Sequence, residues 1–181
     1  AARRAFEYVN KQYSEDQVKT EAQLWTGRCY KQLKQYDKAI VIYDAIKSEN
    51  KELELPWVVR KDLPLAYADM YIAQGNYSQA AKFLEKAIPL NRNARLRTRI
   101  YFILAQIYQL EKKDVRSGEY FTKVMKGSAS FEMAFNARIN LAKSFDIRTG
   151  DKAELENQLK RMAKDAKNKD FNENYASLCS G

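Results

Sequence analysis

One helical pattern recurs five times along this chain of 181 residues, and it constrains the fold more than any other feature. In each copy a small residue, or Leu in the last copy, is followed four positions later by a large apolar residue and three positions after that by another. Spacings of four and three place all three side chains on one face of an α-helix. The copies are Ala2/Phe6/Val9, Ala39/Tyr43/Ile46, Ala80/Leu84/Ala87, Ser117/Phe121/Val124 and Leu155/Leu159/Met162. Their first members lie 37, 41, 37 and 38 residues apart, which predicts a stack of similar units.

A second pattern precedes four of the five copies, and it completes each unit. A large residue is followed directly by a small one and, three positions further, by an aromatic residue; the copies are Thr26/Gly27/Tyr30, Tyr67/Ala68/Tyr71, Leu104/Ala105/Tyr108 and Leu141/Ala142/Phe145. The small residue would allow two helices to approach closely, and the aromatic residue would fill the space beside that contact. Only 9 or 10 residues separate the aromatic residue from the next copy of the first pattern. Each pair of patterns therefore predicts a helical hairpin with a short turn.

The composition agrees with an all-α fold and argues against several functions. The chain has only six Gly and three Pro, so few positions interrupt regular structure. Its net charge of +9 is spread along the whole length, and the tightest cluster, Arg92, Arg95, Arg97 and Arg99, cannot occupy one helical face. We therefore expect no nucleic-acid site there. No apolar run is long enough to span a membrane.

Histidine is absent, which removes the commonest general base and the commonest metal ligand. The two cysteines, Cys29 and Cys179, are 150 residues apart. We interpret Cys29 as a small core residue, and we expect no metal, no cofactor, no small-molecule substrate and no catalytic residue.

The paired patterns resemble the tetratricopeptide repeat, whose unit of about 34 residues carries small and aromatic residues at these offsets. The clearest copy is AYADMYIAQGNYSQAAKFLEKAI, in which Gly75 and Asn76 would end the first helix. The family's early Trp is displaced by two residues, to Trp25, and its closing Pro is not at the usual place. The resemblance implies a right-handed superhelix of antiparallel hairpins, a single array over 1–181. Its expected parts are a partial hairpin 1–14, hairpins 20–48, 61–91, 98–127 and 135–166, and the start of a further helix at 171–181, in a piece of a longer protein.

Two stretches, NARLRTRIYFILAQIYQLEKK (93–113) and FEMAFNARINLAKSFD (131–146), resemble a narrower group, the tetratricopeptide-repeat lipoproteins of the Bacteroidota known as SprE or PorW. That resemblance implies a connector in the cell envelope that serves type IX secretion and gliding motility. It would place the chain on the periplasmic face of the outer membrane, attached only through a lipid anchor outside these residues.

In such an array the first helices line a concave groove that binds a protein or peptide segment. The repeat register predicts that one face of each first helix points into this groove. The residues on that face are Glu21, Leu24, Arg28, Lys31, Gln32, Asp62, Leu65, Asp69, Ile72, Arg99, Phe102, Gln106, Gln109, Asn136, Ile139, Lys143 and Asp146. Their mixed charge suits a partner segment of mixed charge, and Asp62 and Asp69 argue against binding of a terminal carboxylate.

The segment 48–64, where the spacing stretches to 41 residues, supports two interpretations. Trp57 and Val58 could form a protruding adhesive loop, because Trp is enriched at binding hot spots. The alternative, which we favour, is that Leu53, Leu55 and Val59 with their neighbours fold back over the hairpin junction.

The sequence as a whole predicts a non-enzymatic scaffold for protein–protein interactions, with the envelope connector as its preferred special case. A generic tetratricopeptide-repeat adaptor is the first alternative. An RNA-binding helical-repeat protein is the second, favoured only by the net charge, because the groove residues do not recur in type as a base-reading code would.

Overall fold

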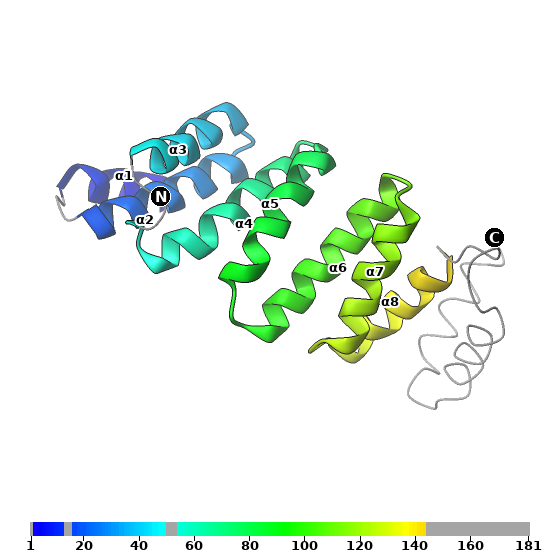
Figure 1. The fold of residues 1–181 in the computed structure, drawn as a ribbon. Helices are drawn as coiled ribbons and strands as arrows, with labels where there is room; N and C mark the ends of the chain where they lie inside the picture. Colours follow the sequence, from blue (N-terminus) through cyan, green and yellow to red (C-terminus); the bar gives the residue numbers. More distant parts are fainter. Residues whose placement is uncertain (1, 13–15, 50–53, 144–181) are drawn as a thin grey trace.

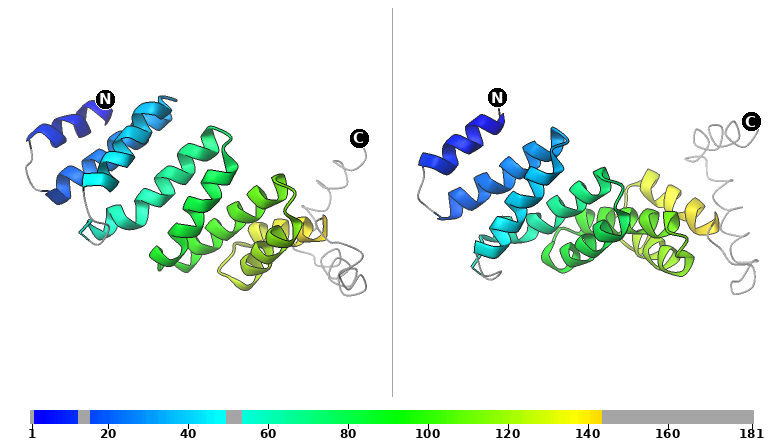
Figure 2. Two further views of the ribbon diagram at one scale, coloured as in Figure 1. Left: turned by 45° about the horizontal axis from the view of Figure 1, so that its top comes forward. Right: turned by 90° about the horizontal axis from the view of Figure 1, so that it is seen from above.

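The computed structural model describes residues 2–12, 16–49 and 54–143, and within them it contains eight α-helices and no strand (Figure 1). The helices are α1 (Ala2–Gln12), α2 (Asp16–Gln32), α3 (Tyr36–Glu49), α4 (Trp57–Ala73), α5 (Tyr77–Leu90), α6 (Ala94–Leu110), α7 (Asp114–Lys126) and α8 (Phe131–Lys143). They pair as hairpins α2/α3, α4/α5 and α6/α7, with α1 packed on α2 and α8 packed on α7. The hairpins follow one another along one direction in chain order (Figures 1 and 2). The prediction of an all-α helical-repeat solenoid is confirmed.

The three hairpin turns share one backbone conformation. Lys34, Gly75 and Lys112 follow the first helices with φ of 58°, 72° and 56°. In each turn the next residue donates its N–H to the carbonyl five positions back, as Asn76 does to Tyr71 at 2.8 Å. This is the hydrogen bond of a helix that ends in a left-handed residue. The prediction that Gly75 and Asn76 end the first helix is confirmed, and the two lysines adopt a conformation that glycine adopts without strain.

The predicted triplets on α3, α5 and α7 form the core, whereas in the triplet on α1 Ala2 is exposed and Phe6 and Val9 are only half-buried. All three residues of the triplets beginning at Ala39, Ala80 and Ser117 are buried, with exposed fractions of 3% or less. The close approach predicted at Gly27 is also present, because a Cβ there would overlap the Tyr43 ring, with Cδ1 at 2.9 Å and Cζ at 3.1 Å. The triplet beginning at Leu155 lies outside the described residues.

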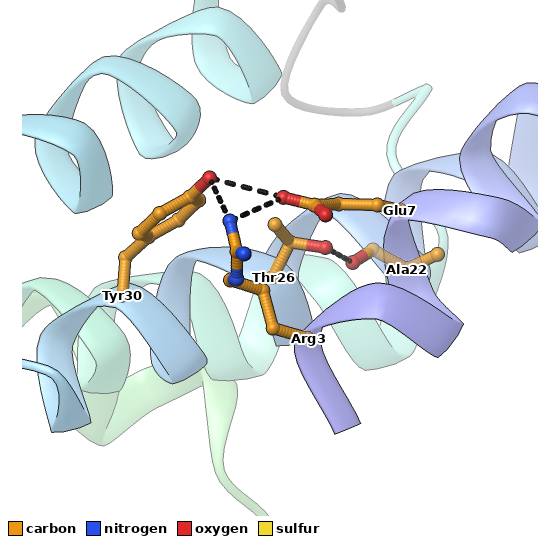
Figure 3. Close-up of polar contacts among 5 residues, drawn as sticks. All are labelled: Arg3, Glu7, Ala22, Thr26 and Tyr30. Atoms are coloured by element: carbon orange, nitrogen blue, oxygen red, sulfur yellow. Dashed lines mark hydrogen bonds and ion pairs between the residues drawn. The ribbon is translucent and has the colours of Figure 1, made fainter. Parts of the chain in front are cut away.

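Successive units are joined by a hydrogen bond that recurs at a fixed sequence separation. On the first helices α2, α4 and α6 a tyrosine donates its hydroxyl to a carboxylate on the preceding second helix, 23 residues earlier. The pairs are Tyr30 to Glu7 at 3.0 Å, Tyr67 to Asp44 at 2.5 Å and Tyr108 to Glu85 at 2.8 Å. At the first pair Arg3 donates to both the Tyr30 hydroxyl and the Glu7 carboxylate (Figure 3).

The 41-residue spacing arises in the connection between α3 and α4. α3 ends at Glu49 and α4 begins at Trp57, whereas α5 ends at Leu90 and α6 begins at Ala94. The bonded tyrosine on α4 is accordingly Tyr67 and not Tyr71, which has the repeat position of Tyr30 and Tyr108. Residues four apart lie on one face of a helix, so Tyr67 presents its hydroxyl one turn earlier.

Candidate partner-binding surface

The first helices α2 and α4 lie in direct contact through two ion pairs. Arg28 Nη2 is 3.1 Å from Asp62 Oδ2, and Lys31 Nζ is 2.8 Å from Asp69 Oδ2. All four residues are among those that the sequence predicts to face the groove. Their charges therefore compensate one another between adjacent hairpins, which leaves less of that charge for a partner.

A cavity of about 490 Å³ opens where α1, α2 and α4 meet. It brings together three of the predicted groove residues, Arg28, Gln32 and Asp69. The other residues that line it are Ala2, Arg3, Arg4, Trp25, Cys29 and Leu33. Its volume is in the range of ligand-binding pockets, roughly 300–1,000 Å³.

Trp25 lines this cavity, although the repeat register does not place it on the face predicted to point into the groove. Trp25 is 46% exposed, and the Arg28 guanidinium lies 4.5 Å from its ring centroid. The ring of Phe6 on α1 stacks with the Trp25 ring at a centroid distance of 6.1 Å. Leu33, also in the lining, is 55% exposed. The spacing of three between Trp25 and Arg28 was the available signal, because residues three apart on a helix are neighbours.

The charge of this cavity is positive. It is lined by three arginines and one carboxylate, and the carboxylate, Asp69, is paired with Lys31. A hydrogen bond with Tyr30 and the charge of Glu7 raise the pKa of Arg3, so its guanidinium stays protonated. Arg28 and Arg3 have partners within the chain, whereas Arg4, which also lines the cavity, is exposed.

The remaining predicted groove residues differ in exposure. Arg99, Gln106 and Asp69 are exposed, and Gln109 and Asn136 are half-buried. Phe102 is half-buried and packs edge-on against Phe121 at 6.0 Å, as part of the core of α6 and α7. The side chain of Lys143, the last residue of α8, and all of Asp146 lie outside the described residues.

Leu24 is a correction to the predicted groove face. Its side chain is 1% exposed and belongs to the core formed by α2, α3 and α4. The repeat register predicted that Leu24 faces the groove, whereas the structure exposes the next residue, Trp25. A helix that packs against two neighbours buries a wider face than the pattern of one hairpin indicates.

The segment 48–64 has features of both interpretations. Leu55 and Val59 are buried, as expected if the segment folds back. Trp57 and Val58 are 43% and 42% exposed, but they lie on the first turn of α4 and not on a loop. Residues 50–53, and with them Leu53, lie outside the described residues.

Two residues of the arginine cluster, Arg92 and Arg97, make contacts with neighbouring groups of the chain. Arg97 Nη1 donates to the carbonyl oxygens of Asn91 and Arg92 at 3.0 and 2.8 Å. The Arg92 guanidinium lies 5.8 Å from the centroid of Trp57. The cluster therefore does not present four cations on a common face.

Two segments of the chain match family models. Residues 21–52 match one tetratricopeptide repeat model, and residues 65–93 match another. Each of these two segments is therefore similar to a tetratricopeptide repeat. Tetratricopeptide repeats in general serve as scaffolds for protein–protein interaction, and the proteins that carry them are typically non-enzymatic. The narrower resemblance lies in residues 93–113 and 131–146, of which the second match includes only residue 93, and no curated protein matches the chain.

Two further observations concern the described residues alone. No helix among them is long and apolar enough to cross a membrane. They also contain no group of three or more His, Cys, Asp or Glu side chains arranged to hold a metal ion.

Proposed function

We propose that the tetratricopeptide repeats bind an extended or helical segment of a partner protein along the first helices, anchored in the cavity between α1, α2 and α4. The observation that carries this proposal is the exposure of Trp25 and Leu33 in that cavity, beside the exposed Arg4. Large apolar side chains in a concave, positively charged site favour a partner residue that is itself apolar and has an acidic neighbour.

The first helices beyond the cavity continue this surface with exposed polar groups. Arg99 and Gln106 lie seven residues apart on α6, which is two helical turns, so they share one face. A partner segment that runs from α2 toward α6 would thus meet an apolar anchor first and polar side chains afterwards. The Arg28–Asp62 and Lys31–Asp69 pairs would hold the relative positions of α2 and α4 beneath it.

Site-specific photo-crosslinking in the full-length protein, in its native cells, tests this proposal. A photoreactive amino acid at Gln32 or at Gln106 should crosslink the same partner, and the crosslinks should disappear in a Trp25→Ala background. The same amino acid at Lys126, exposed at the end of the second helix α7, is the matched control. Equal crosslinking at Lys126, or no effect of Trp25→Ala, would refute binding along the first helices.

We further propose, from the resemblance of residues 93–113 and 131–146, that the scaffold is a cell-envelope connector in a secretion and gliding apparatus. On this proposal the repeats face the periplasm and a lipid anchor elsewhere in the protein attaches them to the outer membrane. Fractionation of cells that express the tagged full-length protein tests it. Recovery in the outer-membrane fraction, with loss of secretion and gliding on gene deletion, is the expected result, and a cytoplasmic location would refute it.

A further inference from the structure

A second cavity, also of about 490 Å³, lies on the other side of α4 from the groove residues. It is formed by α3, α4, α5 and the residue Leu55, and its walls are largely apolar. The lining residues are Lys47, Leu55, Arg60, Leu63, Pro64, Tyr67, Phe83, Lys86, Pro89 and Leu90.

The helical register separates the two cavities. Arg60, Pro64 and Tyr67 are spaced four and three residues apart, so they share one face of α4. Asp62 and Asp69 are each two residues from a member of this set and therefore point to the opposite side, toward α2. A ligand in the second cavity would thus contact a surface that the proposed groove partner leaves uncovered.

The charged residues that line the second cavity are all cations: Lys47 on α3, Arg60 on α4 and Lys86 on α5. The Nε of Arg60 is buried and has no hydrogen-bond partner. A buried donor without an acceptor costs free energy that an incoming acceptor would recover. The cavity thus combines an apolar floor with three cations and an unsatisfied donor.

An exposed aromatic residue extends this surface beyond the cavity. The Arg60 guanidinium lies 4.9 Å from the centroid of Trp57, and the Arg92 guanidinium lies 5.8 Å from it. Trp57 and its neighbour Val58 remain 43% and 42% exposed. An apolar ligand that leaves the cavity past Arg60 would therefore meet an exposed ring with two cations close to it.

We propose that the second cavity binds a segment of a partner protein in which a bulky apolar side chain is flanked by acidic residues. The apolar side chain would occupy the floor formed by Leu63, Pro64 and Phe83. The acidic residues would pair with Lys47, Lys86 and Arg60, whose Nε would gain an acceptor. The repeat array would then hold two partners at once, one on each side of α4.

Charge complementarity selects this partner class. A polyanion without apolar groups would leave the floor uncovered, and an apolar segment without carboxylates would leave the cations unpaired in a desolvated site. A segment that offers both satisfies both parts of the cavity.

The proposal is tested with a labelled peptide, Glu-Asp-Phe-Glu-Asp with blocked ends, added to the 181-residue protein. Fluorescence anisotropy measures its dissociation constant, and a Trp25→Phe background leaves Trp57 as the chain's one tryptophan, so that its emission reports binding at this site. The expected result is saturable binding with a change in Trp57 emission. Two control peptides, Gln-Asn-Phe-Gln-Asn and Glu-Asp-Ala-Glu-Asp, should each bind at least about tenfold more weakly.

Three variants assign the binding to the cavity. Lys86→Glu and Arg60→Ala should each raise the dissociation constant by about tenfold or more, whereas Lys126→Glu, an exposed charge reversal on α7, should change it less than about twofold. Lys86 is exposed, so its variant is expected to fold even if Arg60→Ala does not. Arg4→Glu, at the first cavity, should leave the Trp57 emission change and its midpoint unchanged, which separates binding in the second cavity from any binding of the same peptide in the first.

Several results would overturn the proposal. These are no binding of the acidic peptide at millimolar concentration, equal binding of the neutral peptide, or equal losses with Lys86→Glu and Lys126→Glu. Loss of the Trp57 emission change with Arg4→Glu, but not with Lys86→Glu, would place the peptide in the first cavity and would also overturn it.

Discussion

Glu85 is the acceptor on which the contact between the second and third hairpins depends. Its Oε1 accepts hydrogen bonds from the Tyr108 hydroxyl at 2.8 Å and from the Tyr120 hydroxyl at 3.0 Å. Arg116 donates to the Tyr108 hydroxyl at 3.1 Å. One carboxylate on α5 therefore holds side chains of α6 and α7, and Glu85→Ala removes all of these bonds to it.

The cost follows from the burial of the two tyrosines, which are 3% and 8% exposed. A buried hydroxyl that loses its acceptor costs about 1–3 kcal/mol, and hydrogen bonds to charged groups lie at the upper end. The network is only partly buried, so water can replace some of the lost bonds. We expect Glu85→Ala to lower the free energy of unfolding by about 2–4 kcal/mol, and Glu85→Gln, which keeps an acceptor oxygen without the charge, by about 1 kcal/mol.

Urea unfolding followed by far-UV circular dichroism measures these values. Glu119→Ala, which removes an exposed carboxylate on α7, is the matched control and should change the free energy by less than about 0.5 kcal/mol. Adding Tyr108→Phe and Tyr120→Phe to Glu85→Ala should restore part of the loss, because the unsatisfied hydroxyls disappear. If Glu85→Ala is no more destabilising than Glu119→Ala, the tyrosine–carboxylate bonds do not stabilise the junction.

Four further predictions concern the hairpins themselves. Ala105→Leu, at a position that is fully buried, should overpack the α6/α7 hairpin and cost about 1–3 kcal/mol, as should Ala80→Leu in α5; unchanged thermal melts would mean that the register is wrong. Gly27→Ala should cost a similar amount of about 1–3 kcal/mol in urea unfolding, because its Cβ would overlap the Tyr43 ring, and adding Tyr43→Leu should reduce that cost. Lys112→Gly should stabilise the fold by about 1 kcal/mol, because φ is 56° there, whereas Lys113→Gly should not. Burial raises the pKa of Tyr43, Tyr67 and Tyr120, and the carboxylate partners of Tyr67 and Tyr120 raise it further, so the folded state favours the neutral phenols. The free energy of unfolding should therefore be retained below about pH 10 and fall above it by up to about 1.4 kcal/mol per pH unit for each tyrosine. Thermal melts between pH 8 and 11 measure this slope, which Tyr67→Phe should reduce.

The recurring tyrosine–carboxylate bond shows how a repeat tolerates a change of length. The connection before α4 is longer than the others, and the aromatic residue at the expected position, Tyr71, is not the one bonded to Asp44. Tyr67, four residues earlier, makes that bond. In the first three triplets the acceptor directly follows the large apolar residue, as Asp44 follows Tyr43, so this spacing is a signal for the bond in the sequence.

For the described residues, the sequence by itself determined the hairpins α2/α3, α4/α5 and α6/α7 and the buried face of α3, α5 and α7. These properties are local: the spacing of apolar side chains selects the face of a helix, and Gly75 with Asn76 selects the end of one. The matches of residues 21–52 and 65–93 to tetratricopeptide repeats rest on the same local pattern.

Only the tertiary structure decided which of the predicted groove residues are exposed and which of the cations are already paired. Leu24 and Trp25 are adjacent in the sequence, yet the first is buried and the second exposed, because α2 packs against both α3 and α4. Arg28 meets Asp62, 34 residues away, through the offset between two hairpins. That offset results from the packing of whole helices against one another, and the spacing of residues within one helix carries no information about it.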